Sequence, residues 1–338
     1  MKKAVVILNF NGRDFLRQFL PGVLAHSGTA SVFVADNGST DDSLKILQSE
    51  FPQVNVIALM QNLGFCAGYN EALRQISAQY FVLLNSDVEV TPDWLQPLFE
   101  RLEADPSVAA AQPKILSFHN RTEFEYAGAA GGYLDWLGYP FCRGRIFHVT
   151  ECDEGQYDNA QPIFWASGAC LFIRARCFHE LGGLDADFFA HMEEIDLCWR
   201  LRRKGYLIYA VPQSVVYHVG GGTLAAQQPK KTYLNFRNNL SLLVKNRKIL
   251  TLTAIIPIRL FLDSVALLRF VFTGQVKHAG AVASAYLDFF RGLPYEFRKR
   301  QQLNWLPYLP TDPLLLPRAL VIEFFLKRRR SYRQLVDQ

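Results

Sequence analysis

Four short apolar runs alternate with helical patterns through the first third of the chain, and this alternation limits the fold more than any other feature. The runs span Ala4–Leu8, Ser31–Ala35, Val54–Ala58 and Tyr80–Leu84. Strands that are apolar on both faces are typical of a parallel sheet covered by helices on both sides. We therefore expect an α/β fold with a mostly parallel, Rossmann-like sheet flanked by helices.

A polar cluster follows each of these runs. The clusters are Asn9 with Asn11, Asp36 to Ser39, Asn62 to Gly64, and Asn85 to Asp87. In open α/β sheets, ligands bind at the carboxyl ends of the strands. The four clusters therefore predict one ligand site at that edge of the sheet.

Later segments continue the α/β pattern. Thr91 is expected to be the N-cap of a helix from about Pro92 to Leu102. A second helical pattern runs from Glu193 to Lys204, and its neighbours are predicted strands at Ala169–Ile173, Leu207–Ala210 and Val215–Tyr217. The loop-rich stretch from Lys114 to Pro162 indicates no chemistry.

Charge divides the chain into two parts. Residues 1–245 hold 21 Lys and Arg against 25 Asp and Glu, whereas residues 246–338 hold 15 against 6 and carry a net charge of +9. A basic, apolar tail favours an anionic surface as its partner. We expect an α/β domain over 1–245 and a helical, basic, membrane-associating region over 246–338.

The tail holds no continuous apolar span. Ile249–Phe272 is strongly apolar but is interrupted by Pro257, Arg259, Asp263 and Arg269, so an interfacial amphipathic helix is predicted instead of a transmembrane one. The clusters Arg298–Arg300 and Lys327–Arg330 would add attraction for anionic headgroups. An apolar stripe of this kind can also serve a protein partner.

The six cysteines show no C-x-x-C spacing, which argues against a zinc site or a thioredoxin-like redox motif. We expect them to be reduced and mostly buried. The apolar run after Met1, Lys2 and Lys3 is too short for a signal peptide and favours the first strand of a cytoplasmic protein.

Asp87 and His218 are the candidate metal ligands. Asp87 follows the Tyr80–Leu84 run, which places its carboxylate at the ligand-binding edge, although a lone Asp after a strand is more often a turn former. His218 ends a short strand before three glycines, and most isolated histidines are structural. Together they would form a mixed oxygen and nitrogen site for Mn²⁺ or Mg²⁺, the type of cation that neutralises a diphosphate.

Carboxylates elsewhere suggest two further roles. Asp36 can accept hydrogen bonds from a base or ribose, because Thr40 or Asp41 can cap the following helix. Glu193 and Glu194 begin a helix beside a glycine-rich approach. They either complement the helix dipole or supply a general base for an acceptor hydroxyl.

Taken in order, seven segments of the chain resemble glycosyltransferase family 2, which has the GT-A fold, and especially its rhamnosyltransferase-like branch. They are Val5 to Asn11, Val34 to Asp41, Asn62 to Asn70, Leu83 to Asp87, Gly183 to Asp185, Glu193 to Arg200, and His218 before its glycines. The resemblance covers roughly residues 3 to 245. It implies a metal-dependent, inverting transfer of a sugar from a nucleoside diphosphate.

The resemblance also assigns residues. It implies that Asp36 contacts the nucleobase and that Asp87 and His218 bind the metal. Asn85 stands where many relatives carry the first Asp of an Asp-x-Asp motif, which leaves more of the metal binding to Asp87. The full predicted nucleotide set is Asn9, Asn11, Asp36, Asn62, Gly64, Asn85 and Ser86.

Glu194 occupies the position of the family's usual catalytic Asp, so it is the predicted base, with Glu193 as the alternative because the longer side chain reaches farther. Trp165, Ser167 and Asp196 are the predicted acceptor contacts. Trp165 would stack on a sugar or instead pack beneath the acceptor loop. Asp196 would instead make a structural contact with Arg200 at i+4.

The expected partners are a nucleoside-diphosphate sugar, a glycan or lipid-linked glycan acceptor and an anionic membrane surface. No nucleic acid is expected, and a homo-oligomer is possible. The expected location is cytoplasmic, peripheral on the inner face of a bacterial membrane. Two rivals remain. A sugar nucleotidyltransferase would share the sheet and metal, but the first strand lacks its Gly-rich basic loop. A non-catalytic membrane scaffold would not need the carboxylates and His218.

Overall fold

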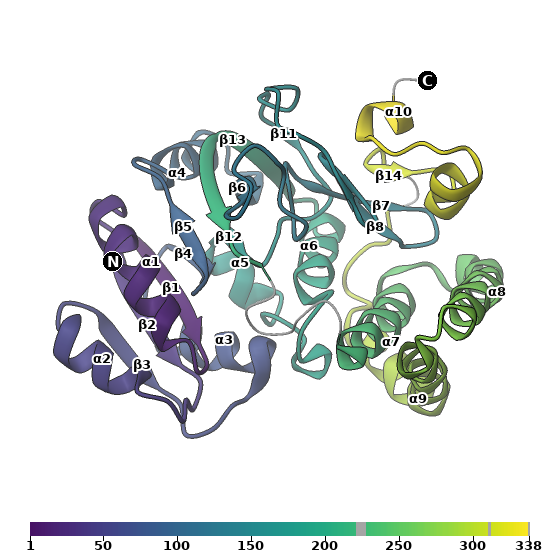
Figure 1. The fold of residues 1–338 in the computed structure, drawn as a ribbon, viewed down its shortest axis with the longest axis horizontal. Coiled ribbons are helices and arrows are strands. Elements are labelled where there is room, and N and C mark those ends of the chain that lie inside the picture. Colours follow the sequence, from purple (N-terminus) through teal and green to yellow (C-terminus); the bar gives the residue numbers. More distant parts are fainter. Residues whose placement is uncertain (221–227, 310–311, 337–338) are drawn as a thin grey trace.

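The computed structural model describes residues 1–220, 228–309 and 312–336, and a large mixed sheet forms its centre (Figure 1). The strands lie in the order β11-β13-β6-β12-β4-β1-β2-β3, with β5 paired to β13. Their bounds are β1 Lys3–Asn9, β2 Ser31–Asp36, β3 Asn55–Ala58, β4 Tyr80–Asn85, β5 Val88–Val90, β6 Val108–Ser117, β11 Gln161–Pro162, β12 Cys170–Arg174 and β13 Leu207–His218.

The first four strands form the parallel part of the sheet, as the apolar runs predict. Alternate residues of β1 enter different cores: Val5 and Ile7 pack with α1, α2 and α4, whereas Ala4 and Val6 pack with α3, α5 and α6. Helices therefore cover both faces, which explains why these strands are apolar throughout. The helices are α1 Arg13–His26, α2 Ser43–Glu50, α3 Gly64–Arg74, α4 Leu95–Ala104, α5 Ala175–Glu180 and α6 Glu193–Arg203.

The other part of the sheet is mixed, because β12 runs antiparallel to both β4 and β6. Strand β13 is continuous across the two predicted strands, with a register shift between Val211 and Val215. Helix α4 begins at Leu95, three residues later than predicted. The Thr91 hydroxyl does not cap it but donates to the Val215 carbonyl (2.8 Å), and Asp93 adopts a left-handed φ of 57°.

A small second sheet lies beside α6 and α7, in the order β10-β9-β8-β7-β14. Its strands are β7 Gly132–Asp135, β8 Pro140–Cys142, β9 Arg145–Ile146, β10 Val149–Thr150 and β14 Leu315–Leu316. All six cysteines are free and only Cys152 is exposed, as expected from their spacing.

The C-terminal part is helical. It comprises α7 Pro229–Asn246, α8 Ile249–Phe272, α9 Val276–Gln302, a π-turn over Ile322–Leu326 and α10 Tyr332–Val336. Helix α8 coincides with the predicted apolar segment. Within the described residues, no helix is both long and apolar enough to cross a membrane. The division of the chain after residue 245 falls at the end of α7 and stays a prediction.

Candidate active site

Asn9 and Asp36 end neighbouring strands in register and meet at the carboxyl edge of the sheet. The Asn9 amide donates to Asp36 Oδ1 (3.0 Å), and the backbone N–H of Ser39 donates to Asp36 Oδ2 (3.0 Å). Asp36 has no exposed surface. Asp36 therefore holds the loops after β1 and β2 together, and its contact with a nucleobase stays a prediction.

Asparagine side chains join the loops further along this edge. Asn11 accepts the backbone N–H of Thr40 (2.7 Å), and Asn62 accepts the N–H of Gly64 (2.8 Å). Asn37 donates to Asn62 (3.1 Å) and accepts the N–H of Leu63. The loops after β1, β2 and β3 are thus fixed to one another, as a preorganised ligand edge requires.

Asp87 and His218 face each other at the end of the same edge. Strand β13 pairs with β5, which brings Asp87 Oδ1 to 3.2 Å from His218 Nε2. The Asn85 amide lies 3.4 Å from the same nitrogen. On the other side of the ring, Glu125 Oε2 lies 3.2 Å from His218 Nδ1. The glycine loop at 221–223 that follows His218 lies outside the described residues.

The two carboxylates determine the charge of this histidine. Burial by itself would lower the pKa of His218, but hydrogen bonds and charge from Asp87 and Glu125 outweigh it and raise the pKa to about 10. Burial likewise opposes ionisation of Asp87, yet the bond to His218 keeps the pKa of Asp87 below its usual value. A cation is therefore favoured at this point, supplied here by the imidazolium.

The turn before α6 is strained, and a side chain of α7 holds it in place. His191 and Met192 have left-handed φ angles of 69° and 73°, so Glu193 and Glu194 start the helix from an unusual direction. Asn238 of α7 donates to the backbone carbonyls of Phe188 (2.9 Å), Ala190 (2.9 Å) and His191 (2.7 Å). Strain that its surroundings enforce is typical of functional sites.

Glu193 is buried and Glu194 is partly exposed, and each has a buried Oε2 without a hydrogen-bond partner. Burial and the charge of Glu194 raise the pKa of Glu193 well above its usual value. Burial raises the pKa of Glu194 to about 7. The protonated form of Glu193 is therefore favoured, and Glu194 can exchange a proton near pH 7.

A short backbone segment connects this helix start to the Asn85–Asp87 motif. The N–H of Asn85 donates to the Ala169 carbonyl (3.0 Å). The preceding residue is Gly168, and a methyl group there would lie 3.8 Å from Cβ of Glu194 and 3.5 Å from the ring of Phe65. Glu194 therefore lies beside Gly168, one residue before the carbonyl that the Asn85–Asp87 motif contacts.

Residues 4–170 match the family model described as Glycosyl transferase family 2. The chain belongs to this family. The family explains why the sequence motifs gather at one edge of the sheet, and it makes the protein a glycosyltransferase.

Curated relatives include the N-acetylglucosaminyl-diphospho-decaprenol L-rhamnosyltransferase of Mycobacterium tuberculosis, which is 28% identical over 230 residues, or 63% of this chain and 75% of the relative. The low-salt glycan biosynthesis hexosyltransferase Agl10 of Haloferax volcanii is 21% identical over 240 residues, or 70% of this chain and 73% of the relative. Both similarities extend beyond residue 170, because each covers more residues than the family match.

Solved structures share the fold. A mannosyltransferase of Pyrobaculum calidifontis in complex with GDP-Man and Mn²⁺ superposes with a TM-score of 0.52 at 16% identity, covering 89% of this chain and 84% of that one. GalNAc-T7 with UDP, GalNAc and Mn²⁺ gives 0.57 at 17% identity, covering 74% of this chain and 48% of that one. The glycosyltransferase therefore has the GT-A fold.

The three predicted acceptor contacts of the glycosyltransferase are all buried. Asp196 binds Arg200 (2.8 Å), as the i+4 spacing predicts, and also Lys245 (2.8 Å). The Ser167 hydroxyl donates to the Ala127 carbonyl (2.7 Å). The Trp165 indole donates to the Tyr133 carbonyl (3.0 Å). The partners of Trp165 and Asp196 correspond to the structural alternatives, and contact of the three residues with an acceptor stays a prediction.

Trp165→Ala is expected to lower the free energy of unfolding by about 3–5 kcal/mol, the usual cost of deleting a buried Trp side chain. The Trp165 ring covers Gly132, where an added Cβ would fall 2.0 Å from the indole. Urea denaturation measures the change. Trp305→Ala is the matched control, because Trp305 is 51% exposed and its loss should cost less than about 1 kcal/mol. Equal losses in the two variants would contradict the packing role.

Sequence patterns missed three residues of this site. Asn37 directly follows Asp36 in a recognised motif and could have been found there. Glu125 lies in the loop-rich stretch, where no pattern marks it. Asn238 acts through three backbone carbonyls some fifty positions away in the chain, and only the packing of α7 reveals it.

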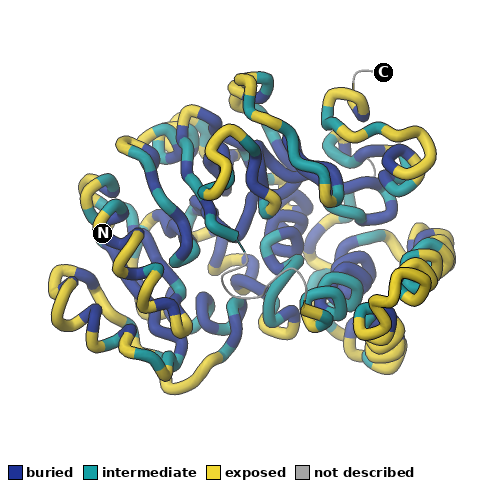
Figure 2. The backbone as a smooth tube through the Cα atoms, in the orientation of Figure 1, coloured by how far each residue is buried: buried dark blue, intermediate teal, exposed yellow. Residues whose placement is uncertain are grey.

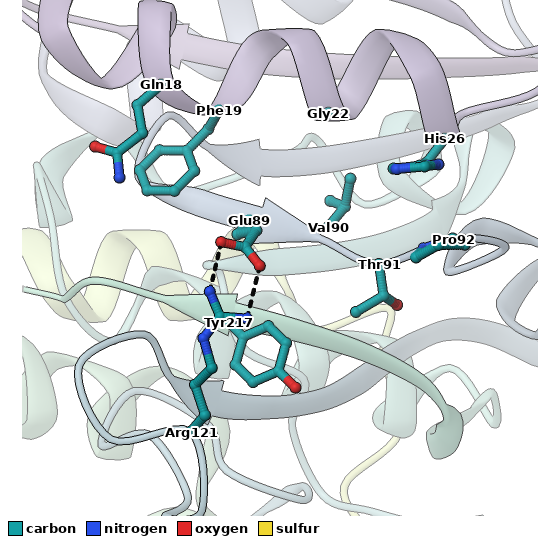
Figure 3. Close-up of a pocket in the computed structure, with 10 residues that line it drawn as sticks. All are labelled: Gln18, Phe19, Gly22, His26, Glu89, Val90, Thr91, Pro92, Arg121 and Tyr217. Carbon is teal, nitrogen blue, oxygen red and sulfur yellow. Dashed lines mark hydrogen bonds and ion pairs between the residues drawn. The ribbon is translucent and has the colours of Figure 1, made fainter.

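A separate cavity of about 530 Å³ opens between α1 and β5 (Figure 3). Glu89 and Arg121 form a two-pronged ion pair across it (2.9 and 2.8 Å), next to Tyr217. Glu89 and Tyr217 alternate with Val88 and His218 along their strands, so they point to the opposite face. The cavity is therefore not part of the candidate active site.

Proposed function

We propose that this glycosyltransferase moves a sugar, with rhamnose as the first candidate, from a nucleoside diphosphate to a lipid-linked glycan acceptor with inversion at the anomeric carbon. The observation that carries the proposal is that Asn85, two residues before Asp87, and Cβ of Glu194 lie against the same segment, Gly168–Ala169. Asp87 itself lies 3.2 Å from His218. The rhamnosyltransferase and hexosyltransferase relatives support the sugar class.

The Asp87–His218 pair fits a divalent cation. Asp87 Oδ1 and His218 Nε2 lie 3.2 Å apart, and they would supply one oxygen and one nitrogen donor once the imidazolium had lost its Nε2 proton to the incoming cation. Glu125 on the far nitrogen would orient the ring, as carboxylates do for metal-binding histidines. When bound, the cation, Mn²⁺ or Mg²⁺, would neutralise the leaving diphosphate.

The protein itself supplies few ligands to such an ion. In the described ranges 1–220, 228–309 and 312–336, no group of three or more His, Cys, Asp or Glu side chains is arranged to hold a metal. Diphosphate oxygens and water would therefore complete the coordination, which makes the metal and the donor mutually dependent ligands. Metal-dependent nucleotide binding is the corresponding expectation.

Glu194 is the proposed base. Its pKa of about 7 allows it to take a proton from an acceptor hydroxyl near neutral pH. Glu193 is 5% exposed and its protonated form is favoured, which suits it less for this role. The hydroxyl would then attack the anomeric carbon from the face opposite the diphosphate. Holding the two substrates in line contributes on the order of 7–11 kcal/mol to such reactions.

Donor recognition is proposed for the fixed loops after β1 to β3. Asn9, Asn11, Asn62 and Gly64 form these loops, and Ser86 lies beside them, because an added Cβ at Gly12 would be 3.5 Å from the Ser86 hydroxyl. The nucleoside diphosphate would lie across this edge with its phosphates toward Asp87. The identity of the base is left to experiment.

The acceptor is proposed to be presented at a membrane surface. The name of the mycobacterial relative includes a decaprenol diphosphate, and the tail of this chain is basic and apolar. A peripheral position on the inner face of the membrane, a bacterial source and a homo-oligomer stay predictions.

Calorimetric titration with UDP, dTDP and GDP, each with and without Mn²⁺, tests the proposal. We expect one nucleotide to bind and its affinity to depend on Mn²⁺. Product analysis then separates the enzyme classes: transfer releases the nucleoside diphosphate, whereas a sugar nucleotidyltransferase releases pyrophosphate. No binding of any nucleotide would instead support a non-catalytic scaffold.

A further inference from the structure

Helix α8 buries a charged pair and leaves a row of large apolar side chains exposed. Arg259 and Asp263 are each 2% exposed, whereas Leu250, Phe261 and Phe272 are 80%, 69% and 85% exposed. A helix on the surface of a soluble domain normally turns its charged face to water. The buried charged pair therefore needs partners inside the molecule, and the exposed apolar side chains indicate a partner outside it.

The internal cause is a set of polar contacts with the buried pair. Arg259 donates to the Leu137 carbonyl (3.0 Å) and to Asp263 (3.1 Å). Asp263 accepts the hydroxyls of Tyr139 (2.6 Å) and Tyr286 (2.6 Å), which come from the turn between β7 and β8 and from α9. Rotating α8 would leave these charges buried without partners, at a large cost. The orientation of α8 is thus fixed.

The exposed face is a continuous apolar stripe. Its members recur at helical spacing along the whole length of α8, and the helix runs along the outer side of the molecule (Figure 2). They are Leu250, Ala254, Ile258, Phe261, Val265, Leu268 and Phe272. A stripe of this length exceeds what scattered surface apolar residues provide and marks an interaction site.

Basic residues flank the stripe. The guanidinium of Arg269 lies 5.8 Å from the ring centre of Phe325, which joins α8 to the C-terminal segment. In that segment Phe325 and Leu326 are 47% and 77% exposed, and the side chains of Arg328 and Arg330 follow them at the surface. An apolar surface bordered by cations complements an anionic bilayer, where lipid tails meet charged headgroups.

We propose that the outward stripe of α8 and the segment 325–330 dock on the surface of an anionic bilayer, with α8 lying in the plane of the headgroups. Docking would bring the enzyme to the membrane that holds the lipid-linked acceptor. This part of the inference rests on the proposed function. Docking would also orient the active site. Lys299 of α9 binds Asp185 (2.7 Å) in the loop before α6, and Asn238 of α7 holds the turn that starts α6.

Flotation of the full chain with vesicles tests the docking. We expect it to float with phosphatidylcholine vesicles containing phosphatidylglycerol, less with phosphatidylcholine alone, and less again at high salt. Phe261→Gln with Leu268→Gln should lower the partition coefficient at least about tenfold, because two apolar side chains leave the interface. Val56→Gln with Met60→Gln is the matched control, because both residues are exposed and apolar on the far edge of the sheet.

A second pair of variants tests the role of the basic residues in binding the anionic vesicles. Arg328→Gln with Arg330→Gln should lower partition into the anionic vesicles about tenfold or more and remove most of the salt dependence. Lys45→Gln with Arg74→Gln removes two exposed cations from the catalytic part and should change little. Circular dichroism of every variant establishes that it is folded.

Three results would overturn the docking: no flotation of the wild-type chain on either vesicle, equal losses in the stripe and control variants, or a wild-type dimer that the stripe variant dissociates without changing flotation. The last would assign the stripe to a second copy of the chain. Flotation requires no catalysis. A chain that floats but transfers no sugar would support the docking and contradict the proposed function. A chain that transfers sugar but does not float would contradict the docking alone.

Discussion

Glu194→Gln is expected to lower the turnover number about thousandfold at pH 8 while leaving the Kd of the nucleotide unchanged. The amide keeps the shape of the side chain but cannot take a proton, and a positioned base contributes about 10²–10⁴-fold. Steady-state kinetics and calorimetry measure the two quantities. Glu193→Gln is the matched control and should cost less than about tenfold, because Glu193 is 5% exposed and its protonated form is favoured. The reverse ranking would make Glu193 the base.

The pH profile follows from the same group. Burial raises the pKa of Glu194 to about 7, so the carboxylate is protonated and inactive as a base below that pH. The kcat/KM of the wild-type enzyme should therefore rise with pH through about 7 and level off above it. A profile without this limb would contradict the assignment of the base.

The free energy of unfolding should fall as the pH rises, whereas activity should rise. Glutamate titrates near 4.5 in an unfolded chain and near 7 here, so the folded state disfavours the ionised form. The penalty is absent below pH 4.5, grows between the two values and reaches about 3 kcal/mol above pH 7. Glu194→Gln should thus raise the thermal midpoint at pH 8 but not at pH 4.5. Such a gain would show that activity and stability compete at this position.

Asp87→Asn is expected to remove the Mn²⁺ dependence of nucleotide binding and to lower turnover about thousandfold. The substitution keeps the shape but deletes the charge that faces His218 at 3.2 Å, and metal neutralisation of a leaving group contributes several kcal/mol. Calorimetry with and without Mn²⁺ measures the first effect, and initial rates measure the second. Chelation of the wild-type enzyme should reproduce the kinetic loss.

Two further variants define the site. Glu125→Gln should weaken the apparent metal affinity about 10–100-fold, as loss of a carboxylate behind a metal-binding histidine does, without abolishing transfer. Glu89→Gln is the matched control, because Glu89 lies two residues from Asp87 but points into the cavity and pairs with Arg121. Retained Mn²⁺ stimulation in Asp87→Asn would exclude Asp87 as a ligand.

The sequence by itself determined the elements and the edge at which they act. Strands β1 to β4 follow from apolar runs whose two faces enter different cores, and the position of α8 follows from its apolar content. Both signals are local and periodic, so neighbouring residues carry them. The Asp196–Arg200 pair was likewise predictable, because residues four apart on a helix meet.

Only the tertiary structure decided which side chains meet and which face is exposed. Glu125 reaches His218 through the pairing of distant segments. Trp165 and Ser167 bond to the carbonyls of Tyr133 and Ala127, which lie 32 and 40 positions away in the chain. The apolar residues of α8 predicted a helix but not its rotation. That rotation depends on Tyr139 and Tyr286 holding Asp263, and contacts between residues so far apart in the chain leave no periodic trace in the sequence.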